Sequence, residues 1–412
     1  MAALAVSERV LTEGTGVCAP QGFRAGVAAA GIRGDGDLQR LDVAVVVSDR
    51  PAAAAGVFTR NSVKAAPVVI SQLTLRRGGA VSAVLINAGN ANACTGAQGL
   101  RDALVMCATA AEVLDLDPAE VLVCSTGVIG RPMPMPQTVQ GIREAAAALA
   151  RNGEAAARAI MTTDRRPKQA HATCDAGGVE YHVGGMAKGA GMIHPDMATL
   201  LGVVTTDAPV PRTLLQPMLR RAAEATFNRI TVDGDTSTND TLLLLANGAA
   251  GGDPLTDGSA ALASMERCVH KVCESLAEQV VADAEGASRA FRVNVIGAQD
   301  DAQAKAAATT VAQSPLVKTA VHGADPNWGR IVAALGRSGA AFVLDRLTIA
   351  IGGITVFDAG APCDVELAAV RAALGQPRVV IDVQLGAGEA QSHAWGCDLS
   401  PEYVHINADY TT

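Results

Sequence analysis

Two kinds of hydrophobic periodicity alternate along this chain, and they limit the folds that it can adopt. Apolar residues recur every three or four positions from Leu214 to Phe227 and from Leu262 to Val280, which predicts two helices that each bury one face. Apolar and polar residues alternate from Phe291 to Val295 and from Val379 to Leu385, which predicts strands. Because helical and extended segments alternate throughout, we expect an α/β or α+β architecture with layered sheets.

The core of such a fold has to be built here from aliphatic side chains. Hydrophobic residues make up 49% of the 412 residues, whereas aromatic residues make up only 3%. This length allows two or three domains with a large core. The low aromatic content leaves few side chains on which nucleic-acid bases could stack.

The net charge and the cysteine content limit which binding partners and which cellular compartment suit this chain. The net charge of -8 and the lack of a basic block argue against binding to a phosphate backbone. No apolar stretch approaches the roughly 20 residues that cross a bilayer, and the first residues lack the basic and apolar regions of a signal sequence. The nine cysteines form no CxxC pair, which favours reduced thiols. We expect a cytoplasmic protein that binds neither nucleic acid nor membranes.

The common motifs for cofactors, metals and serine hydrolases are missing. The sequence contains no GxxxxGK[ST] run, no GxGxxG after a strand, no HExxH and no GxSxG. Its seven histidines never fall at the paired spacing of metal ligands. We therefore expect no metal and no bound cofactor.

Residues 188–207 form the segment with the clearest chemical potential. A glycine-rich loop is followed by a turn at Pro195 and then, from Thr199, by an apolar β-branched run that is typical of a central strand. Clusters of glycine with polar residues also occur at 87–96, 124–130 and 233–240, where main-chain groups could contact a ligand. From the pattern alone, however, Thr199 could equally be an ordinary first strand residue.

The string KGAGMIHPDMATLL, from Lys188 to Leu201, resembles the self-processing segment of the ornithine acetyltransferase family, also called the bifunctional glutamate N-acetyltransferase family. The resemblance extends along nearly the whole chain, because further blocks look like family blocks in family order. These blocks are FTRNSVKAAPV at 58–68, INAGNANACTG at 86–96, CSTGVIG at 124–130, IMTTD at 160–164, STNDT at 237–241, ADAEG at 282–286, DPNWGR at 325–330 and INADYTT at 406–412.

The resemblance implies a layered helix–sheet–sheet–helix sandwich and cleavage between Ala198 and Thr199. The products would be an α chain of residues 1–198 and a β chain of residues 199–412, assembled as a heterotetramer of two α and two β chains. Thr199 would then be an N-terminal nucleophile, whose α-amine, with a reference pKa of about 8, can act as a base beside its own hydroxyl.

The resemblance also assigns roles to residues outside the cleavage segment. Thr126 and Gly127 would form the oxyanion hole. The substrate contacts would be Thr162, Lys188, Thr199, Glu285, Asn407 and Thr412, with the choice between Thr162 and Thr163 left open. A carboxylate on Lys188 and an ammonium on Glu285 would suit an amino-acid ligand. From the residues alone, these positions could equally be a tight turn, solvated charges and a frayed chain end.

Two other features allow competing interpretations. Trp328, in the block at 325–330, could form a wall of the substrate site or pack in a turn, and we do not assign it to the site. His194 and Asp196 occupy positions of the cleavage loop where the family tolerates many residues, so they are interpreted as exposed polar loop groups.

The implied activity is transfer of an acetyl group from N-acetyl-L-ornithine to L-glutamate in cyclic arginine biosynthesis, by a ping-pong mechanism through acetyl-Thr199. Ornithine is released, and acetyl-CoA could be a second acetyl donor. Three alternatives remain open at this point: an N-terminal-nucleophile aminopeptidase or amidase, an acetyltransferase of secondary metabolism with another acceptor, and an uncleaved scaffold.

Overall fold

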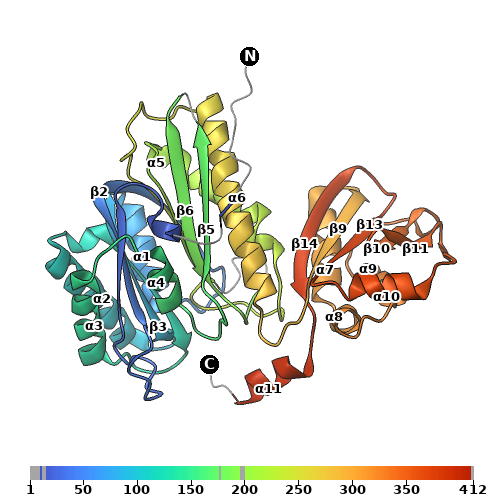
Figure 1. Cartoon of the computed structure of the whole chain (residues 1–412), viewed down its shortest axis with the longest axis horizontal. Helices are drawn as coiled ribbons and strands as arrows, with labels where there is room; N and C mark the ends of the chain where they lie inside the picture. Colours follow the sequence, from blue (N-terminus) through green and yellow to red (C-terminus); the bar gives the residue numbers. More distant parts are fainter. Residues whose placement is uncertain (1–9, 12–14, 176–177, 195–199, 410–412) are drawn as a thin grey trace.

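The computed structural model describes residues 10–11, 15–175, 178–194 and 200–409. Its N-terminal two thirds contain one large mixed sheet, with strand order β4-β3-β2-β8-β7-β6-β5 and β1 paired to β2 (Figure 1). The strands are β1 Phe23–Ala28, β2 Val43–Phe58, β3 Val81–Asn90, β4 Val121–Val128, β5 Lys168–Asp175, β6 Glu180–Lys188, β7 Leu201–Thr206 and β8 Thr241–Ala246.

The long strand β2 divides this sheet into two leaves. Its first half, from Val43 to Val47, pairs with β1 and β3, and its second half, from Ala53 to Phe58, pairs with β8. The register shifts between Val47 and Ala52, which is where the strand passes from one leaf to the other. We call β1, β3, β4 and the first half of β2 the first leaf, and the second half of β2 with β8, β7, β6 and β5 the second leaf.

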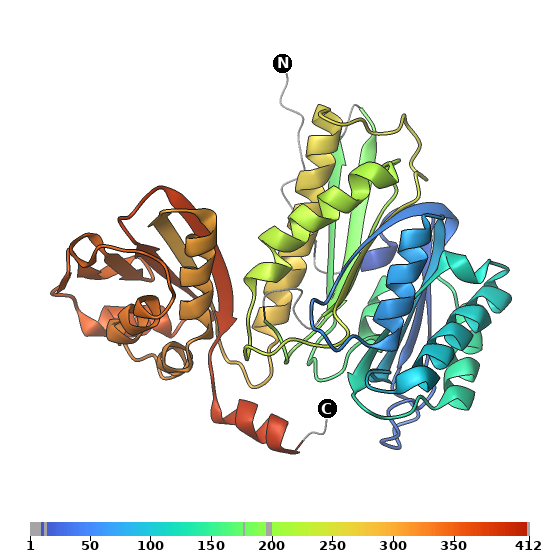
Figure 2. The ribbon, with the colours of Figure 1, turned by 180° about the vertical axis from the view of Figure 1, so that it is seen from behind.

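The two leaves pack face to face around a shared aliphatic core. Val46 and Ile86 of the first leaf and Val203 and Leu243 of the second belong to the same buried cluster. Helices cover the outer faces, so the predicted helix–sheet–sheet–helix sandwich is confirmed for this part of the chain (Figure 2). The outer helices are α1 Ala66–Arg77, α2 Gly96–Leu114 and α3 Met135–Ala147 on the first leaf, and α5 Arg212–Ala225 and α6 Ala260–Ala282 on the second.

Short elements complete the sandwich. The helix α4, Gly153–Ala159, contributes Ala156 and Ala157 to the core between the leaves. The short 3-10 helices are η1 Gly16–Cys18, η2 Pro118–Glu120, η3 Phe227–Arg229 and, later in the chain, η4 Leu344–Arg346.

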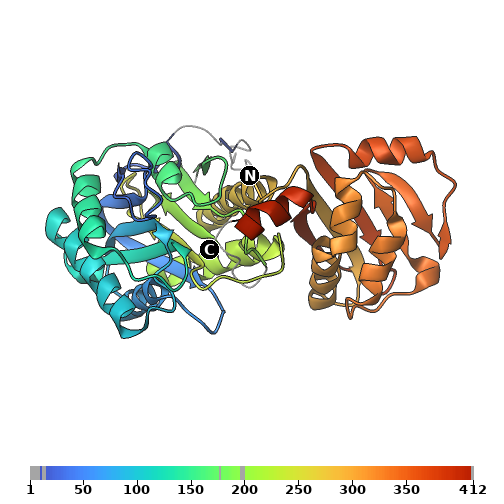
Figure 3. The same ribbon diagram turned by 90° about the horizontal axis from the view of Figure 1, so that it is seen from below.

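A second module with its own core follows the sandwich. Its sheet has the order β12-β11-β10-β13-β9-β14, and its helices gather around a separate buried cluster. The strands are β9 Ala290–Ala298, β10 Thr348–Ile351, β11 Ile354–Asp358, β12 Ala361–Pro362, β13 Arg378–Gln384 and β14 Ala390–Cys397. The helices are α7 Asp301–Gln313, α8 Pro315–His322, α9 Trp328–Gly336 and α10 Leu367–Leu374. A last helix, α11 Pro401–Asp409, leaves this module and returns toward the sandwich (Figure 3).

The elements predicted from periodicity are present. The two helical stretches correspond to α5 and α6, and the two alternating stretches to β9 and β13. The run after Thr199 becomes β7, whose residues are all buried. Trp328 is half-buried and packs on Phe357, with ring centroids 4.9 Å apart, but it begins the helix α9 and does not lie in a turn.

The order of strands in the second leaf ties together segments from both sides of position 199. The strands β7 and β8 lie between β2 and β6, and they pair with both. A cut between Ala198 and Thr199 would therefore leave two polypeptides that share one hydrogen-bonded leaf and one core. Separating them would require unfolding of the sandwich.

The shared core predicts a clear difference between two leucine substitutions. Leu243→Ala, at a fully buried position on β8, should lower the free energy of unfolding by about 2 to 5 kcal/mol, because it removes methyl groups and leaves a cavity. Leu104→Ala on α2, where the side chain is 53% exposed, should change it by less than about 0.5 kcal/mol. Urea denaturation measures both; equal losses would contradict the assigned core.

Candidate active site

A cavity of about 260 Å³ lies where strand ends of both leaves meet the last helix, α11. Each site residue that the sequence predicted and the structure describes lines this cavity. These residues are Thr126, Gly127, Thr162, Lys188, Glu285 and Asn407. Ala198, Thr199 and Thr412 lie outside the described residues. Thr163 also lines the cavity, so the choice between Thr162 and Thr163 stays open.

Thr126 and Gly127 are placed by the close approach of β4 to β3. Gly127 has φ of +132°, and a Cβ atom there would lie 2.2 Å from the carbonyl carbon of Gly89. No larger residue fits at this point without displacing the backbone. Asn239 strengthens the same region, because its side-chain amide donates to the carbonyl oxygen of Ser125 at 2.8 Å. The main chain at the predicted oxyanion hole is thus tightly packed.

Lys188, the last residue of β6, provides the positive end of the cavity. Its side chain is only 5% exposed, and its Nζ donates to Thr126 Oγ1 at 3.3 Å. Burial lowers the pKa of Lys188, and the negative charge of Asp164 opposes this shift. A buried cation of this kind is well suited to bind a carboxylate, because the pair is strong when water is excluded.

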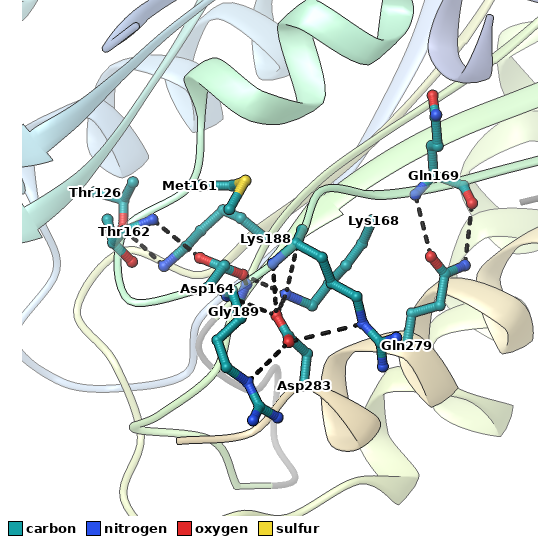
Figure 4. Close-up of polar contacts among 12 residues, drawn as sticks. Thr126, Met161, Thr162, Asp164, Lys168, Gln169, Lys188, Gly189, Gln279 and Asp283 are labelled. Carbon is teal, nitrogen blue, oxygen red and sulfur yellow. Dashed lines mark hydrogen bonds and ion pairs between the residues drawn. The ribbon is translucent and has the colours of Figure 1, made fainter. Parts of the chain in front are cut away.

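Asp164 fixes the chain on both sides of the cavity, as Figure 4 shows. One carboxylate oxygen accepts the backbone N–H of Thr162 at 2.9 Å, and the other accepts the N–H of Gly189 at 2.7 Å. The second oxygen also accepts a hydrogen bond from Lys168 Nζ at 2.5 Å. Thr162 and Lys188 therefore share one buried anchor.

The lining of the cavity also contains acidic groups. Glu285 is 8% exposed, and its Oε2 accepts Asn407 Nδ2 at 2.9 Å, which attaches α11 to the site. Asp233 also lines the cavity, and its Oδ2 accepts the hydroxyl of Tyr403 at 3.3 Å. Burial raises the pKa of Asp233, although hydrogen bonds from backbone amides such as Met192 N–H lower it.

Asp233 and Tyr403 were not predicted as site residues. Asp233 belongs to the glycine-containing polar cluster at 233–240, so a weak sequence signal existed. Nothing in the sequence pattern pointed to Tyr403, because its place depends on the return of α11 to the sandwich. Of the two polar residues in the cleavage loop, His194 has a ring nitrogen 3.4 Å from Thr231 Oγ1 and is not among the cavity residues, and Asp196 lies outside the described residues.

A buried carboxyl group, Asp240, lies just before β8. Asp240 is 1% exposed, and neither of its carboxylate oxygens has a hydrogen-bond partner among the residues that the structure describes. Burial raises the pKa of Asp240 well above its usual range, more than the nearby amide of Leu200 lowers it. Burial therefore favours the protonated form of this carboxyl group.

Comparison with known proteins identifies the family. The model of the ArgJ family matches residues 24–412. The chain belongs to the ArgJ family. The arginine biosynthesis bifunctional protein ArgJ of Symbiobacterium thermophilum is 50% identical over 96% of this chain and 98% of its own length. Its namesake from Dehalococcoides mccartyi is 45% identical over 98% of both chains.

Two solved structures of related proteins are also similar to parts of this chain. An ArgJ chain from Bacillus halodurans is 42% identical, with a TM-score of 0.49, over 50% of this chain and 97% of its own. A chain of the ornithine acetyltransferase from Mycobacterium tuberculosis, solved with ornithine, is 40% identical, with a TM-score of 0.42, over 47% of this chain and 100% of its own.

Membership of the ArgJ family confirms two predictions made from the sequence. The resemblance to the ornithine acetyltransferase family is correct, and the chain is an acetyltransferase of arginine biosynthesis. None of the described helices is both long and apolar enough to cross a membrane. The roles of the individual site residues stay predictions.

The raised pKa of Asp240 in this ArgJ protein predicts a pH-dependent effect of Asp240→Asn. As the pH rises above about 4, the unfolded aspartate loses its proton before the folded one does, so the wild type loses stability. Asparagine cannot ionise. The unfolding free energy of the variant, relative to the wild type, should therefore increase as the pH rises above about 4 in urea denaturation.

Asp300→Asn provides the matched control for this slope. Asp300 accepts the backbone N–H of Gln303 at 2.8 Å, and this bond and a second one from the Gln303 side chain lower its pKa. Its substitution should give a slope of the opposite sign, confined to more acidic pH. A difference between Asp240→Asn and wild type that does not depend on pH would show that Asp240 is ionised in the folded protein.

Proposed function

We propose that this ArgJ protein transfers an acetyl group from N-acetyl-L-ornithine to L-glutamate, with Thr199 as the nucleophile after cleavage of the Ala198–Thr199 bond. The observation that carries the proposal is the cavity whose lining contains both a buried cation, Lys188, and carboxylates. Lys188 suits the α-carboxylate of the donor, and Glu285, with Asp233 near it, suits the side-chain ammonium that N-acetylornithine retains.

The strand register supports Thr199 as the residue beside this cavity. Lys188 at the end of β6 pairs with Leu201 at the start of β7, and Leu201 pairs with Thr241 of β8. Leu201 is two residues beyond Thr199 in the sequence. A new N-terminus created before Thr199 would therefore begin next to the strand position of Lys188.

The two half-reactions need one nucleophile, one base and one oxyanion hole. Thr199 Oγ attacks the acetyl carbonyl and gives its proton to its own α-amine, while Thr126 and Gly127 stabilise the oxyanion. The carbon–nitrogen bond then breaks, and ornithine leaves with the proton on its α-amine. Glutamate enters, its amine attacks the acetyl ester of Thr199, and the threonine hydroxyl is regenerated as N-acetylglutamate leaves.

We further propose that the two products of cleavage stay together as α and β chains and pair as a heterotetramer of two α and two β chains. The shared leaf, in which β7 and β8 lie between β2 and β6, supports the association of one α with one β chain. A cytoplasmic location is proposed as well, because all nine cysteines are free thiols and suit a reducing compartment.

Substitution of Thr199 tests both steps that need its hydroxyl. The wild type should give fragments of residues 1–198 and 199–412, and acetylornithine alone should add one acetyl mass to the second fragment. Thr199→Ala should abolish both cleavage and acetylation, and Thr199→Ser should retain part of each. Denaturing gels and intact-protein mass spectrometry measure these outcomes, with Thr355→Ala on the exposed edge of β11 as control.

Product analysis separates this activity from its alternatives. Acetylglutamate formed from acetylornithine, with parallel double-reciprocal plots at several glutamate concentrations, supports the ping-pong transfer. Free acetate as the main product would favour an aminopeptidase or amidase, and transfer to a different amine would favour an enzyme of secondary metabolism. An intact chain with full activity would overturn the role of cleavage, and the same assay with acetyl-CoA tests the second donor.

Lys188→Met tests the carboxylate contact. Removal of the cation should weaken the binding of acetylornithine by about 2 to 5 kcal/mol, because the substrate carboxylate would be desolvated without a partner. The steady-state KM and a direct binding measurement report this loss. Lys318→Met is the matched control, since Lys318 is also buried, 3% exposed, but belongs to the second module. An unchanged KM in a correctly processed Lys188→Met protein would remove Lys188 from the binding site.

A further inference from the structure

A second buried lysine, Lys168, lies beneath the cavity and does not line it. Its side chain is 1% exposed, and its Nζ lies 2.5 Å from Asp164 Oδ1 and 2.7 Å from Asp283 Oδ2. We call Asp164, Lys168 and Asp283 the buried ionic network. The network joins three elements that are distant in sequence: the segment after α4, the start of β5 and the end of α6.

The buried ionic network contacts the chain beside three predicted substrate-binding residues. Asp164 accepts the backbone N–H groups of Thr162 and of Gly189, the residue after Lys188. Asp283 lies two residues before Glu285, whose own N–H donates to the carbonyl oxygen of Ala190 at 2.9 Å. Figure 4 shows Asp164 between these contacts, with Lys168 and Asp283 on the side away from Thr126 and Thr162.

The network carries one excess negative charge, since it contains two carboxylates and one ammonium. Arg165 and Arg166 also reach Asp283, at 3.3 and 3.7 Å, but their side chains are 59% and 60% exposed, so solvent screens their charges. Burying a carboxylate without compensation costs several kcal/mol, and one lysine between two carboxylates compensates only one of them. The excess charge therefore needs a second buried cation nearby.

Lys188 is that cation. Among the described residues it forms no ion pair of its own, and its Nζ donates to the neutral hydroxyl of Thr126. Burial alone would raise the pKa of Asp164, but the charges of Lys168 and Lys188 together lower it below its usual range. In the reverse direction, Asp164 opposes the lowering of the Lys188 pKa that burial causes.

We propose that Asp164, Lys168 and Asp283 act together as the counter-ion of Lys188, and that they keep this lysine positively charged and in place before a substrate arrives. The proposal rests on the function proposed above, in which Lys188 binds the substrate carboxylate. The three residues are positioning residues, because they act through Lys188, Thr162 and Glu285 and do not contact the substrate.

Other charged and titratable groups near Lys188 also affect its pKa. Glu285, from the segment after α6, favours the cation, and Arg33, from the segment after β1, disfavours it. Asp240, before β8, is also close enough for its pKa to respond to Lys188, although burial raises the pKa of Asp240 well above its usual range. Asp164 has the largest charge effect on Lys188, and Lys168, of opposite sign, has the next largest. Burial has the largest effect on the pKa of Lys188, and Asp164 is the strongest charge that opposes it.

The pH dependence of acetylornithine binding tests this proposal. Affinity should be lost as the pH rises through the pKa of Lys188, and the substrate ammonium, with a reference pKa of about 10.4, stays charged up to a pH of about 9.5. Asp164→Asn removes a negative charge and should move the midpoint of this loss down by about one pH unit or more. The double variant Asp164→Asn/Lys168→Met also removes a positive charge, so its midpoint should lie close to that of the wild type.

This partial restoration separates a charge effect from simple damage to the structure. The double variant loses more contacts than the single variant, so a merely structural role predicts a larger defect and no return of the midpoint. Asp207→Asn is the matched control, because buried Asp207 also accepts two backbone N–H groups, those of Gln21 and His182, and should leave the midpoint unchanged. Asp283→Asn serves as a second single variant if Asp164→Asn does not fold, and it should also move the midpoint down.

The outcomes distinguish this proposal from the proposed function. If Lys188→Met leaves acetylornithine affinity and its pH dependence unchanged, Lys188 does not bind the carboxylate and the proposed site is wrong. If Lys188→Met abolishes the pH dependence, the carboxylate contact is correct. The counter-ion role is then overturned by either of two results: neither aspartate variant moves the midpoint, or the double variant moves it further down than the single variant does.

Discussion

The pairing of β7 with strands on both of its sides is the constraint on which the site depends. Lys188, Leu201 and Thr241 form one row across β6, β7 and β8, and Phe58 of β2 continues the row. Four strands therefore have their positions along the leaf fixed by the same set of backbone hydrogen bonds. A shift of one residue in any of them would turn its side chains to the other face, so the buried core on both sides holds the register. The edge of the leaf where Lys188 lies is thus set by the packing of the whole sandwich.

A site fixed in this way can retain charges that would be unfavourable elsewhere. Lys168, Lys188 and Asp164 are almost completely buried, and their partners have to compensate for the lost hydration. The aliphatic core around them cannot supply hydrogen bonds, so the backbone N–H groups of Thr162 and Gly189 do so. Asp240 follows the same principle, because its burial raises its pKa well above the usual range, by more than the nearby donors lower it. The charge states of the buried groups beside the cavity therefore depend on where hydrogen-bond donors lie, as well as on which residues are present.

Local sequence patterns predicted the parts of the fold that local interactions determine. The periodicity of α5, α6, β9 and β13 comes from burial of one face, which neighbouring residues encode. The division of β2 between two leaves and the separate core of the second module depend on pairings between distant segments, which periodicity does not show. Resemblance to a family supplied the residues of the cavity, including Lys188 and Glu285. Asp233 and Tyr403 escaped prediction because their contact joins two segments, distant in sequence, that only the folded molecule brings together.

The second module is inserted between two parts of the cavity wall, and its attachment explains how α11 reaches the site. The chain leaves the sandwich after Glu285 and returns at Tyr403. Asp398 accepts the N–H groups of Ser288 and Arg289, and Ser400 Oγ donates to the carbonyl oxygen of Gly286 at 2.6 Å. Entry and exit of the module are therefore bonded to each other. Gly286 has φ of +68°, and a Cβ atom there would lie 2.3 Å from the backbone nitrogen of Tyr403, so the two segments touch where only glycine fits. Because of this junction, the position of α11 relative to Glu285 is set by a few bonds at the base of the module, and changes in the sheet beyond them leave the cavity wall in place.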